Sequence, residues 1–547
     1  MMIRRPRSWM QWARRACQTF FLVWFLWTVL VAHLAQVDAV PPLLEVFFDL
    51  DPLIWLATWL STYTIGSGVL LALATLVVTI VLGRVFCGWV CPLGTVHTMA
   101  TWLRRQPDGP VQTESRSPWQ RAKYLLLVAL LVMAVFGVHW IGVFDPLSLL
   151  YRSIAVAALP AAQYALEDGS TAIYRADPQI GPLRVTSVTE PVYRFLRDNL
   201  FRAPGQAFTG AFLIGALFIG VILLNFVKPR FWCRYICPLG ALLGLAAQRP
   251  AMRLHNDPAT CNNCGKCNAA CPAAAQPDKR GDWLPTECFG CWNCVAACNF
   301  SSISFQFGSP FPRPEMGRLD LSRRATVTAA LGGAAALFLF RLTPQAQAKA
   351  YRPELIRPPG ARPEREFLQR CIQCGLCMRV CPTTALHPAG LEAGVEGLWT
   401  PRLIPKIGYC EYNCNLCGQV CPTGAIEPLP LEQKQQVKIG LASVDTTRCL
   451  PYAYGRSCIV CEEHCPVSRK AIYVVEREVE LPDGTRRLLQ QPQVDPDLCI
   501  GCGICENVCV FADKAAIRVT SANESRNPGN QPVLPVAPGA SSGGSYG

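Results

Sequence analysis

The chain has 547 residues, of which 51% are hydrophobic and only 16% are charged, and its formal net charge is +13. This length exceeds that of one ordinary domain, and soluble domains average roughly 25% charged residues, so the composition excludes a single soluble domain. It favours a membrane protein with polar lobes, and the basic residues beside apolar runs indicate membrane orientation rather than a nucleic-acid partner.

Four apolar runs predict that residues 1–247 form an α-helical membrane domain with several passes. The runs are 17–34, 69–85, 124–143 and 208–227. Arg and Lys at the inner ends of the runs agree with one topology, in which the N-terminus is cytoplasmic. A cleaved signal peptide is the alternative for the first run. Residues 46–60 are expected to form an interfacial helix on the outer surface, and the long connection 148–207 is expected to lie outside.

An internal repeat divides this region into two halves. Asp-Pro-Leu, an apolar span and Cys-x-x-x-Cys-Pro-Leu-Gly follow one another in each half, starting at Asp51 and again at Asp145. The cysteines of both motifs are predicted at the cytoplasmic end and are Cys87, Cys91, Cys233 and Cys237. Four such thiolates could bind one further metal cluster. A dithiol relay and structural cysteines at the membrane interface are the alternatives.

A few polar residues are predicted at the outer ends of the spans. Asp49, Asp51 and Asp145 would either accept protons from a quinol or cap helices that begin at proline. His33 and His139 could serve a quinone or a bis-histidine haem. Lone polar residues near an interface are usually solvated, so we keep the quinone as a candidate cofactor and do not expect haem.

Residues 248–310 contain two cysteine groups with the spacing of two-cluster ferredoxins. A [4Fe–4S] cluster takes three thiolates from a C-x2-C-x2-C turn and its fourth from the other group. One cluster is therefore assigned to Cys261, Cys264, Cys267 and Cys298, and its partner to Cys288, Cys291, Cys294 and Cys271. This predicts a small α+β ferredoxin domain of the bacterial type.

Residues 318–350 have the order of an export signal but lie in the middle of the chain. The paired arginines Arg323 and Arg324 precede an apolar run and then small residues, as in a twin-arginine signal. We expect the run 325–340 to be a fifth, outward span that separates inner from outer cysteine groups. Cleavage near Ala348 or Ala350 would release the outer part.

Residues 354–519 contain four further cysteine groups, and the Ser-, Gly-, Asn- and Pro-rich tail 520–547 is expected to be disordered. The groups are Cys371, Cys374, Cys377 and Cys381; Cys410, Cys414, Cys417 and Cys421; Cys449, Cys458, Cys461 and Cys465; and Cys499, Cys502, Cys505 and Cys509. With the inner pair they predict about six [4Fe–4S] clusters. Structural zinc and disulfides are the rejected alternatives, because neither typically shows cysteine triplets followed by Cys-Pro.

These motifs resemble two known partner proteins joined in one chain. Residues 1–310 resemble the NapH-type (MauN-like) membrane ferredoxins, and residues 318–519 resemble the NapG-type (MauM-like) four-cluster ferredoxins. The resemblance implies a bacterial inner-membrane protein with residues 248–310 in the cytoplasm and 354–547 in the periplasm. It also implies that the first outer group pairs with the fourth and the second with the third. Cys371, Cys374 and Cys377 would then pair with Cys509, and sequential pairing is the alternative.

The same resemblance implies electron transfer from the quinol pool to a periplasmic oxidoreductase or cytochrome. That acceptor would belong to a nitrate-reductase-type or methylamine-dehydrogenase-type system, and whether the protein itself acts as a quinol dehydrogenase is left open. The first alternative is a maturation factor that supplies electrons for assembly of a periplasmic metalloenzyme, copper site or cofactor. The second, a redox sensor, has no kinase, nucleotide or DNA motif to support it.

Overall fold

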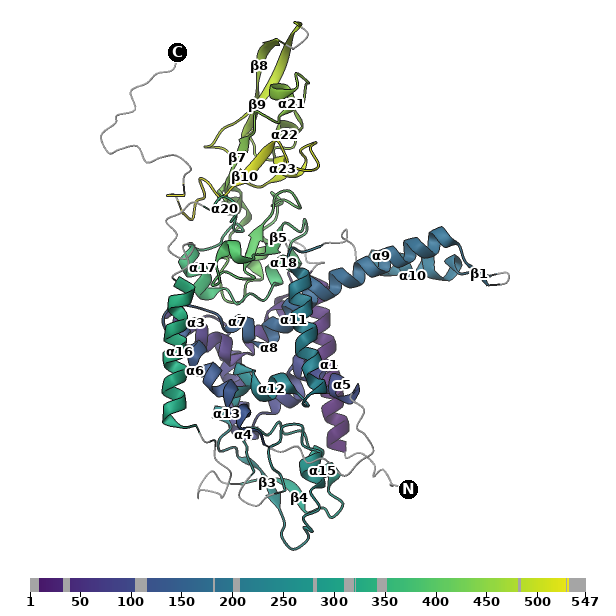
Figure 1. The fold of residues 1–547 in the computed structure, drawn as a ribbon, viewed down its shortest axis with the longest axis vertical. Coiled ribbons are helices and arrows are strands. Elements are labelled where there is room, and N and C mark those ends of the chain that lie inside the picture. The colour runs from purple at the N-terminus through teal and green to yellow at the C-terminus, as the bar shows by residue number, and fades with distance from the viewer. Residues whose placement is uncertain are drawn as a thin grey trace, which may run out of the picture.

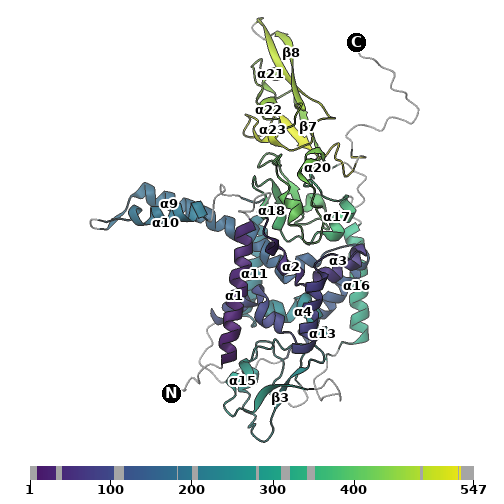
Figure 2. The ribbon, with the colours of Figure 1, turned by 180° about the vertical axis from the view of Figure 1, so that it is seen from behind.

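The computed structural model describes residues 9–32, 40–103, 116–180, 183–199, 207–278, 283–308, 319, 321–341, 352–480, 484–527 and 529–530. Figure 1 shows an elongated molecule in which a helical bundle lies between two cysteine-rich lobes. We name residues 248–308 the inner lobe and residues 352–530 the outer lobe, after their expected sides of the membrane. The helix α1 (Trp9–Ala32) and the helices α11 (Ala211–Leu223) and α16 (Arg323–Arg341) run along the long axis (Figures 1 and 2).

Several helices of the bundle could cross a membrane. By length and hydropathy, α1 and the segments Pro118–Val135 and Pro146–Ala176 meet this condition among the described residues. The segment Pro118–Val135 contains α6 (Ala122–Val135), and α4 (Val69–Leu82) is a shorter apolar helix, as is Ala211–Phe226. Helices therefore form at all four of the predicted apolar runs. Their lengths differ from the predicted ranges because the helices follow backbone hydrogen bonding as well as hydropathy.

The internal repeat of the sequence is also a repeat of local structure. In each half, Asp-Pro-Leu starts a short helix, α3 (Pro52–Thr62) or α8 (Pro146–Arg152), and the aspartate caps it. In each half the C-x3-C motif runs into a further helix, α5 (Pro92–Leu103) or α13 (Pro238–Ala246). Proline at the first helical position removes an N–H that would lack a partner, so both helix starts are favoured.

The region 148–207, expected to be a connection outside the bundle, begins inside it. The helix α8, the π-helical turn η4 (Ser153–Ala158) and α9 (Leu159–Ala176) are continuous, and the residues of α8 are buried in the bundle. The helices α9 and α10 (Thr186–Asn199) then project sideways as a hairpin, with β1 (Gln179–Ile180) and β2 (Leu183–Arg184) at its tip (Figures 1 and 2). The polarity averaged over residues 148–207 is mixed, and this average does not reveal that the first part of the region is buried.

Short elements connect the longer ones. In the bundle these are η1 (Pro42–Leu44), α2 (Val46–Asp49), η2 (Phe86–Val90), η3 (Pro118–Arg121), α7 (Ile141–Phe144), η5 (Leu224–Phe226) and α12 (Phe231–Tyr235). The expected interfacial helix 46–60 is therefore two helices, α2 and α3, which break at Asp51. In the inner lobe, the chain passes from β3 (Met252–Asn256) through α14 (Lys266–Ala269) and α15 (Asn293–Ala297) to β4 (Ile303–Phe307), and β4 pairs with β3 in antiparallel orientation.

The outer lobe contains small antiparallel strand pairs and short helices. Its strands are β5 (Leu386–Pro388) paired with β6 (Pro401–Leu403), β7 (Leu441–Val444) with β10 (Ile517–Thr520), and β8 (Ile472–Glu480) with β9 (Arg486–Val494). Its helices are α17 (Glu364–Arg370), α18 (Leu376–Val380), η6 (Leu391–Ala393), α19 (Leu416–Gln419), α20 (Leu431–Gln436), α21 (Leu450–Ala453), α22 (Val460–Glu463) and α23 (Ile504–Asn507). The β8–β9 ribbon forms the far tip of the molecule (Figure 1).

The helix α16 contains the predicted fifth span and packs along α6. A Cβ atom added to Gly333 would lie 2.6 Å from the backbone oxygen of Ala129 on α6, so only glycine permits this close approach. Near the other end of α16, the rings of Phe340 and Trp140 meet edge to face at 4.6 Å. The helix α16 is not among the described helices that are long and apolar enough to cross a membrane by composition. Its position depends on packing against α6.

We expect Gly333→Leu to destabilise the protein by about 1–3 kcal/mol, because the backbone of α6 cannot yield to an inserted side chain. The thermal unfolding midpoint in detergent measures this effect. Gly332→Leu is the matched control, since a Cβ at Gly332 meets nothing within 4 Å. Equal midpoints for the two variants would contradict the close packing of α16 on α6.

The C-terminal tail, expected to be disordered from residue 520, is ordered at its start. The Ser521 hydroxyl donates to the carbonyl of Arg352 at 2.6 Å, and Asn530 donates to the carbonyl of Ser521 at 2.9 Å. Arg526 forms ion pairs with Glu364 at 2.7 Å and with Glu524 at 2.6 Å. The expectation fails for residues 521–530 because these pairings anchor a polar segment that composition alone marks as unstructured. Residues 531–547 lie outside the described residues.

This anchor is expected to weaken in acid. Burial alone would raise the pKa of Glu364, but Arg357 and Arg526 lower it from 4.5 to about 2. A depressed pKa stabilises the folded state above pH 4.5, and that stabilisation is lost as the pH falls from 4.5 towards 2. Amide hydrogen exchange should therefore show falling protection factors for residues 521–530 in this window. Arg526→Gln should show low protection already at neutral pH, and protection in the unaltered protein that persists down to pH 2 would refute the mechanism.

Candidate iron–sulfur sites and the buried charges around them

Four thiols from the two inner cysteine groups line one cavity of the inner lobe. They are Cys271, Cys288, Cys291 and Cys294, as the crossing pattern predicted. Trp283, Trp292 and Phe305 close its walls. For the second predicted inner set, Cys267 lies in a buried cluster with Ile303 and with Cys294 of the first set, and Cys298 packs against this cluster. Cys264 lies within electrostatic reach of Cys267. The fourth member, Cys261, is partly exposed.

The outer lobe joins cysteine groups that are neighbours in the sequence. Three cavities are lined respectively by Cys371, Cys374, Cys377 and Cys421; by Cys449, Cys458, Cys461 and Cys509; and by Cys465, Cys499, Cys502 and Cys505. The remaining thiols, Cys410, Cys414 and Cys417, lie within electrostatic reach of Cys381. We name the set of Cys371, Cys374, Cys377 and Cys421 the first outer quartet.

The pairing of the first group with the fourth and the second with the third is therefore wrong, and the sequential alternative is correct. Two compact units explain this outcome. The helices α18 and α19 pack together in the first unit, and α22 packs with α23 in the second, which the β7–β10 strand pair closes. A fourth cysteine therefore reaches the neighbouring group of its own unit and not a group of the other unit.

Backbone N–H groups point at the sulfur atoms of several of these thiols. Ala275 N donates to Cys271 Sγ at 3.4 Å, Ile426 N to Cys421 Sγ at 3.4 Å and Ala516 N to Cys509 Sγ at 3.3 Å. Each acceptor is the last cysteine of its group, and each donor follows it by four to seven residues. Such bonds stabilise thiolate sulfur and tune the potential of a bound cluster.

The spacing of the thiols suits a multi-atom cluster. Each lined set offers four thiols, three from one cysteine group and one from another, which is the ligand set of a [4Fe–4S] cluster in two-cluster ferredoxins. The residues present therefore fit a [4Fe–4S] cluster.

The two C-x3-C motifs come together as a buried thiol quartet between the bundle and the inner lobe. Cys91 and Cys237 each lie within electrostatic reach of the other motif, which brings together Cys87, Cys91, Cys233 and Cys237. We name these four the junction quartet. Gly240 N donates to Cys237 Sγ at 3.2 Å, and the backbone of Gly94 bonds Cys91 in the same way. Burial raises the pKa of Cys91 and Cys237, so four thiolates here need a bound cation.

Buried positive charge surrounds the junction quartet. The side chains of Arg84, Lys123 and Arg234 are fully buried, and Arg230 is 2% exposed. Burial alone would lower the pKa of Arg84, but the neighbouring thiols Cys87 and Cys237 and the carboxylate of Glu287 raise it. Buried charges need partners of opposite sign. An anionic centre with four thiolate ligands would supply the negative charge.

Glu287 is the carboxylate of this region. It pairs with Lys123 and lies 3.5 Å from Arg84, and its Oε1 accepts a hydrogen bond from the Tyr124 hydroxyl at 2.9 Å. Arg84 also donates to the carbonyl of Thr286 at 2.7 Å. The network joins the bundle to the cysteine loop of the inner lobe, because Glu287 immediately precedes Cys288.

A short path of contacts links the junction quartet with the inner lobe. The ring of Phe289, the residue after Cys288, lies between the guanidinium groups of Arg84 at 5.1 Å and Arg230 at 4.8 Å. A Cβ atom on Gly88, the residue after Cys87, would lie 2.3 Å from the carbonyl oxygen of Phe289. The backbone next to Cys87 of the junction quartet is therefore in contact with the backbone next to Cys288 of the inner lobe.

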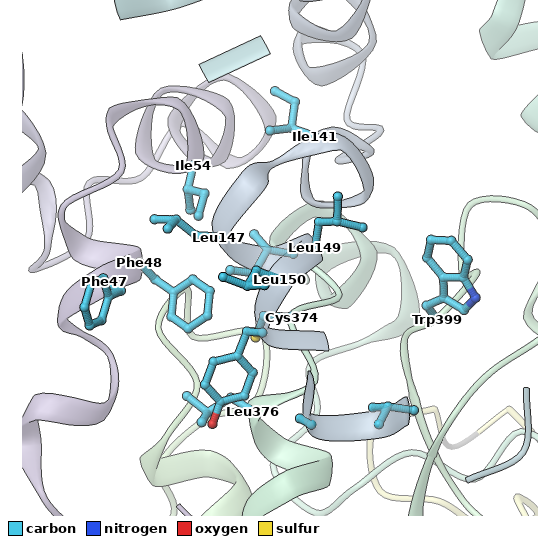
Figure 3. Packing of buried hydrophobic residues seen from close by; sticks show 14 of the residues in the cluster. Phe47, Phe48, Ile54, Ile141, Leu147, Leu149, Leu150, Cys374, Leu376 and Trp399 are labelled. Carbon is cyan, nitrogen blue, oxygen red and sulfur yellow. The ribbon is translucent and has the colours of Figure 1, made fainter. Parts of the chain in front are cut away.

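The first outer quartet lies directly on the opposite end of the bundle. In Figure 3, Cys374 lies next to Leu150 of α8, and Tyr151 and Arg152 of the same helix lie within electrostatic reach of Cys374. The Ser61 hydroxyl donates to the carbonyl of Gln369 at 2.7 Å, Arg152 to the carbonyl of Gln373 at 2.7 Å and Arg379 to the carbonyl of Val29 at 3.1 Å. A Cβ on Gly142 would lie 2.0 Å from the carbonyl oxygen of Ile372. The outer lobe is therefore held through its cysteine loop.

The predicted polar residues of the outer ends of the spans separate into two sets. Asp51 and Asp145 lie together, fully buried, and each caps its helix. Asp49 lies apart from them and beside Gly68. His139 is buried and lies 3.3 Å from the Thr58 hydroxyl. His33 lies outside the described residues.

Two buried arginines beside the candidate sites are not predicted from the sequence. Arg152 is fully buried between the bundle and the first outer quartet, and its guanidinium lies 4.4 Å from the ring centroid of Trp399. In the sequence, Arg84 is one of the basic residues at the inner end of an apolar run. Its position three residues before Cys87 was the available signal, and Arg152 had a similar signal in its place seven residues after Asp145.

Four families of iron–sulfur domains match the chain. A family described as a 4Fe-4S binding domain matches residues 64–108 and 210–255, which contain the two C-x3-C motifs. Families described as 4Fe-4S dicluster domains match residues 253–299 and 370–425, and another 4Fe-4S binding domain matches residues 491–515. The chain therefore contains 4Fe-4S ferredoxin domains. The match over 370–425 covers the first two outer groups as one dicluster unit, in agreement with the observed pairing.

Ferredoxin-type proteins of two systems are similar to different parts of the chain. The methylamine utilization ferredoxin-type protein MauM of Methylorubrum extorquens is 35% identical over 217 residues, 38% of this chain and 92% of MauM. The ferredoxin-type protein NapG of Escherichia coli is 36% identical over 209 residues, 38% of this chain and 87% of NapG. The ferredoxin-type protein NapH of Escherichia coli is 28% identical over 270 residues, 47% of this chain and 73% of NapH. No solved structure matches the chain.

Proposed function

This chain belongs to the family of the ferredoxin-type proteins MauM and NapG, and we propose that it carries electrons from the quinol pool to a periplasmic oxidoreductase. The acceptor would belong to a nitrate-reductase-type or methylamine-dehydrogenase-type system, and the name of the relative MauM refers to methylamine utilization. The NapH-like part would be the membrane domain and the MauM- and NapG-like part the outer lobe. The part that resembles NapH and the part that resembles MauM and NapG would then belong to one molecule.

The observation that carries this proposal is the contact between the first outer quartet and the bundle. Electron transfer requires that the first acceptor lie close to the membrane, where quinol dissolves. Cys374 packs on α8, and the loop that bears it is bonded to Arg152. The sequential pairing then leads from this quartet through the Cys381 set to the two quartets of the second unit, towards the far tip (Figure 1).

We assign about six [4Fe–4S] clusters to the ferredoxin-type groups and a further metal centre to the junction quartet. A [4Fe–4S] cluster supplies one-electron transfer, and the protein residues position it and set its potential. Five features support the centre at the junction quartet: the four thiols, their burial, the N–H donors at Cys91 and Cys237, the surrounding positive charge and the family match.

We further propose a multi-pass protein of the bacterial inner membrane. Residues 1–247 would form the membrane domain, residues 248–310 a cytoplasmic two-cluster domain and residues 354–519 a periplasmic four-cluster domain. The helix α16, which lies in segment 318–350, would be the fifth span. The bundle between the two lobes and the basic residues at the inner ends of the helices support this topology.

The function is tested by mixing the purified, detergent-solubilised protein with excess quinol under anaerobic conditions. Visible absorbance and EPR spectra should show reduction of the clusters. Clusters that stay oxidised with quinol yet become reduced with dithionite would overturn the proposal. That result would favour the alternative role of a factor that supplies electrons for assembly of a periplasmic metalloenzyme.

The centre at the junction quartet is tested by iron analysis. We expect Cys91→Ser and Cys237→Ser each to lower the iron content by about four atoms per chain, as expected for one [4Fe–4S] cluster. Cys17→Ser is the control, because Cys17 lies on α1 outside every cysteine group. An unchanged iron content in both quartet variants would show that these cysteines bind no cluster.

A further inference from the structure

The repeat-related aspartates Asp51 and Asp145 form a buried pair with an incomplete hydrogen-bond arrangement. Asp51 Oδ1 accepts hydrogen bonds from Leu53 N at 2.8 Å and Ile54 N at 3.3 Å. Asp145 Oδ2 accepts hydrogen bonds from Leu147 N at 3.1 Å and Ser148 N at 2.7 Å. One oxygen of each carboxyl group is thus used to cap a helix.

Within the part of the chain that the structure describes, the other oxygen of each carboxyl group accepts no hydrogen bond, although the Ser148 hydroxyl lies within reach of Asp145. Asp51 Oδ2 and Asp145 Oδ1 are both buried and unpartnered, while the two side chains lie within hydrogen-bond reach of each other. Both side chains are 0% exposed. An ionised carboxylate only accepts hydrogen bonds, so two facing carboxylates cannot satisfy each other. One proton between them would satisfy both oxygens.

The surroundings allow this pair to exist with or without that proton. Burial and the neighbouring carboxyl group raise the pKa of Asp51, and burial raises that of Asp145. The N-termini of α3 and α8 and the guanidinium of Arg152 stabilise the ionised form. His139 lies 3.3 Å from the Thr58 hydroxyl on α3. The pair is therefore subject both to effects that oppose its ionisation and to groups that favour it.

Arg152 connects the pair with the first outer quartet. Its guanidinium interacts electrostatically with Asp145 on one side and with Cys374 and Cys371 on the other. It donates to the carbonyl of Gln373, inside the cysteine loop, at 2.7 Å. A negative charge added at the quartet also attracts the guanidinium of Arg152, and this weakens the stabilisation that Arg152 gives to the ionised aspartate pair. The added charge therefore favours protonation of the pair.

We propose that Asp51 and Asp145 hold one proton whose binding is coupled to the electron on the first outer quartet. The two aspartates would take up one proton whenever one electron is added to a cluster held by the quartet. When the electron moves on to the next acceptor, the proton leaves to the outer side. The inference rests on the proposed function, because oxidation of one quinol releases two electrons and two protons, and these would pass through the site one at a time.

The experiment is a redox titration of the full-length protein in detergent, with dithionite and mediators, followed by EPR at several pH values. The signal of the first outer quartet is identified as the one lost in Cys421→Ser. We expect its reduction equilibrium to shift about tenfold per pH unit over part of the range, about 59 mV for one electron. Asp51→Asn and Asp145→Asn should abolish this dependence, since asparagine still caps a helix but cannot share the proton.

Infrared difference spectra of the oxidised and reduced protein give a second readout. The reduced unaltered protein should show a protonated carboxyl band that both asparagine variants lack. Glu45→Gln is the matched control, because Glu45 is another carboxyl group within electrostatic reach of Cys421.

Three results would overturn the proposal. They are a potential independent of pH in the unaltered protein, a dependence that survives in both asparagine variants, and a dependence lost only in Glu45→Gln. Because dithionite supplies the electrons, each of these results is independent of whether quinol reduces the protein.

Discussion

Cys421→Ser is expected to stop quinol from reducing the outer lobe. The substitution removes the one thiol of the first outer quartet that comes from a different group, and this quartet is the one that contacts the bundle. Iron content should fall by about four atoms per chain. Stopped-flow absorbance should show that the remaining outer clusters are reduced at least about tenfold more slowly by quinol, because their electron source has been removed.

Cys509→Ser is the matched control. Cys509 lines the cavity with Cys449, Cys458 and Cys461, in the second unit of the outer lobe. The same amount of iron should be lost, yet quinol should still reduce the other outer clusters at the unaltered rate. The opposite outcome, a block with Cys509→Ser and none with Cys421→Ser, would restore the pairing of the first group with the fourth.

The largest stability effect is expected from Glu287→Ala. Glu287 pairs with Lys123 and lies near Arg84, and both cations are fully buried. Removal of one partner of a buried ion pair costs about 3–5 kcal/mol, because the remaining charges stay desolvated and uncompensated. The thermal unfolding midpoint in detergent should fall accordingly, and the inner lobe should separate from the bundle.

Two further variants test the cause of this loss. Glu190→Ala breaks an exposed pair with Arg194 on α10 and should cost no more than about 0.5 kcal/mol. Lys123→Met combined with Glu287→Gln removes one buried charge of each sign and should recover much of the lost stability. A loss in Glu287→Ala no larger than that in Glu190→Ala would show that the buried network contributes little.

The sequence predicted those features that depend on residues close together in the chain. The C-x2-C-x2-C spacing identified the cysteines that line the cavities, because three ligands of a cluster lie within one turn. Helix capping was one of the two roles that the sequence left open for the Asp-Pro-Leu aspartates, and the structure shows Asp51 and Asp145 as helix caps. Hydropathy located the apolar helices, because a helix needs only its own residues to form.

Properties that depend on distant partners were not predictable in this way. The pairing of the outer groups depends on how α18 meets α19 and how α22 meets α23, and sequence spacing contains no such information. Arg84 and Arg152 resemble ordinary basic residues in the sequence, and their burial depends on loops about two hundred residues away. The order of residues 521–530 likewise depends on Glu364.

The packing of α16 on α6 has a consequence for how the outer lobe stays attached. Two separate proteins would have to meet by diffusion, and a contact made of a few hydrogen bonds would leave most of them apart at cellular concentrations. A continuous chain instead gives the docking surfaces a local concentration on the order of millimolar. While the chain remains uncleaved, weak docking is sufficient for nearly full occupancy, and each helical bundle has one outer lobe. An uncleaved chain thereby fixes a one-to-one stoichiometry that an unlinked pair would reach only through high affinity.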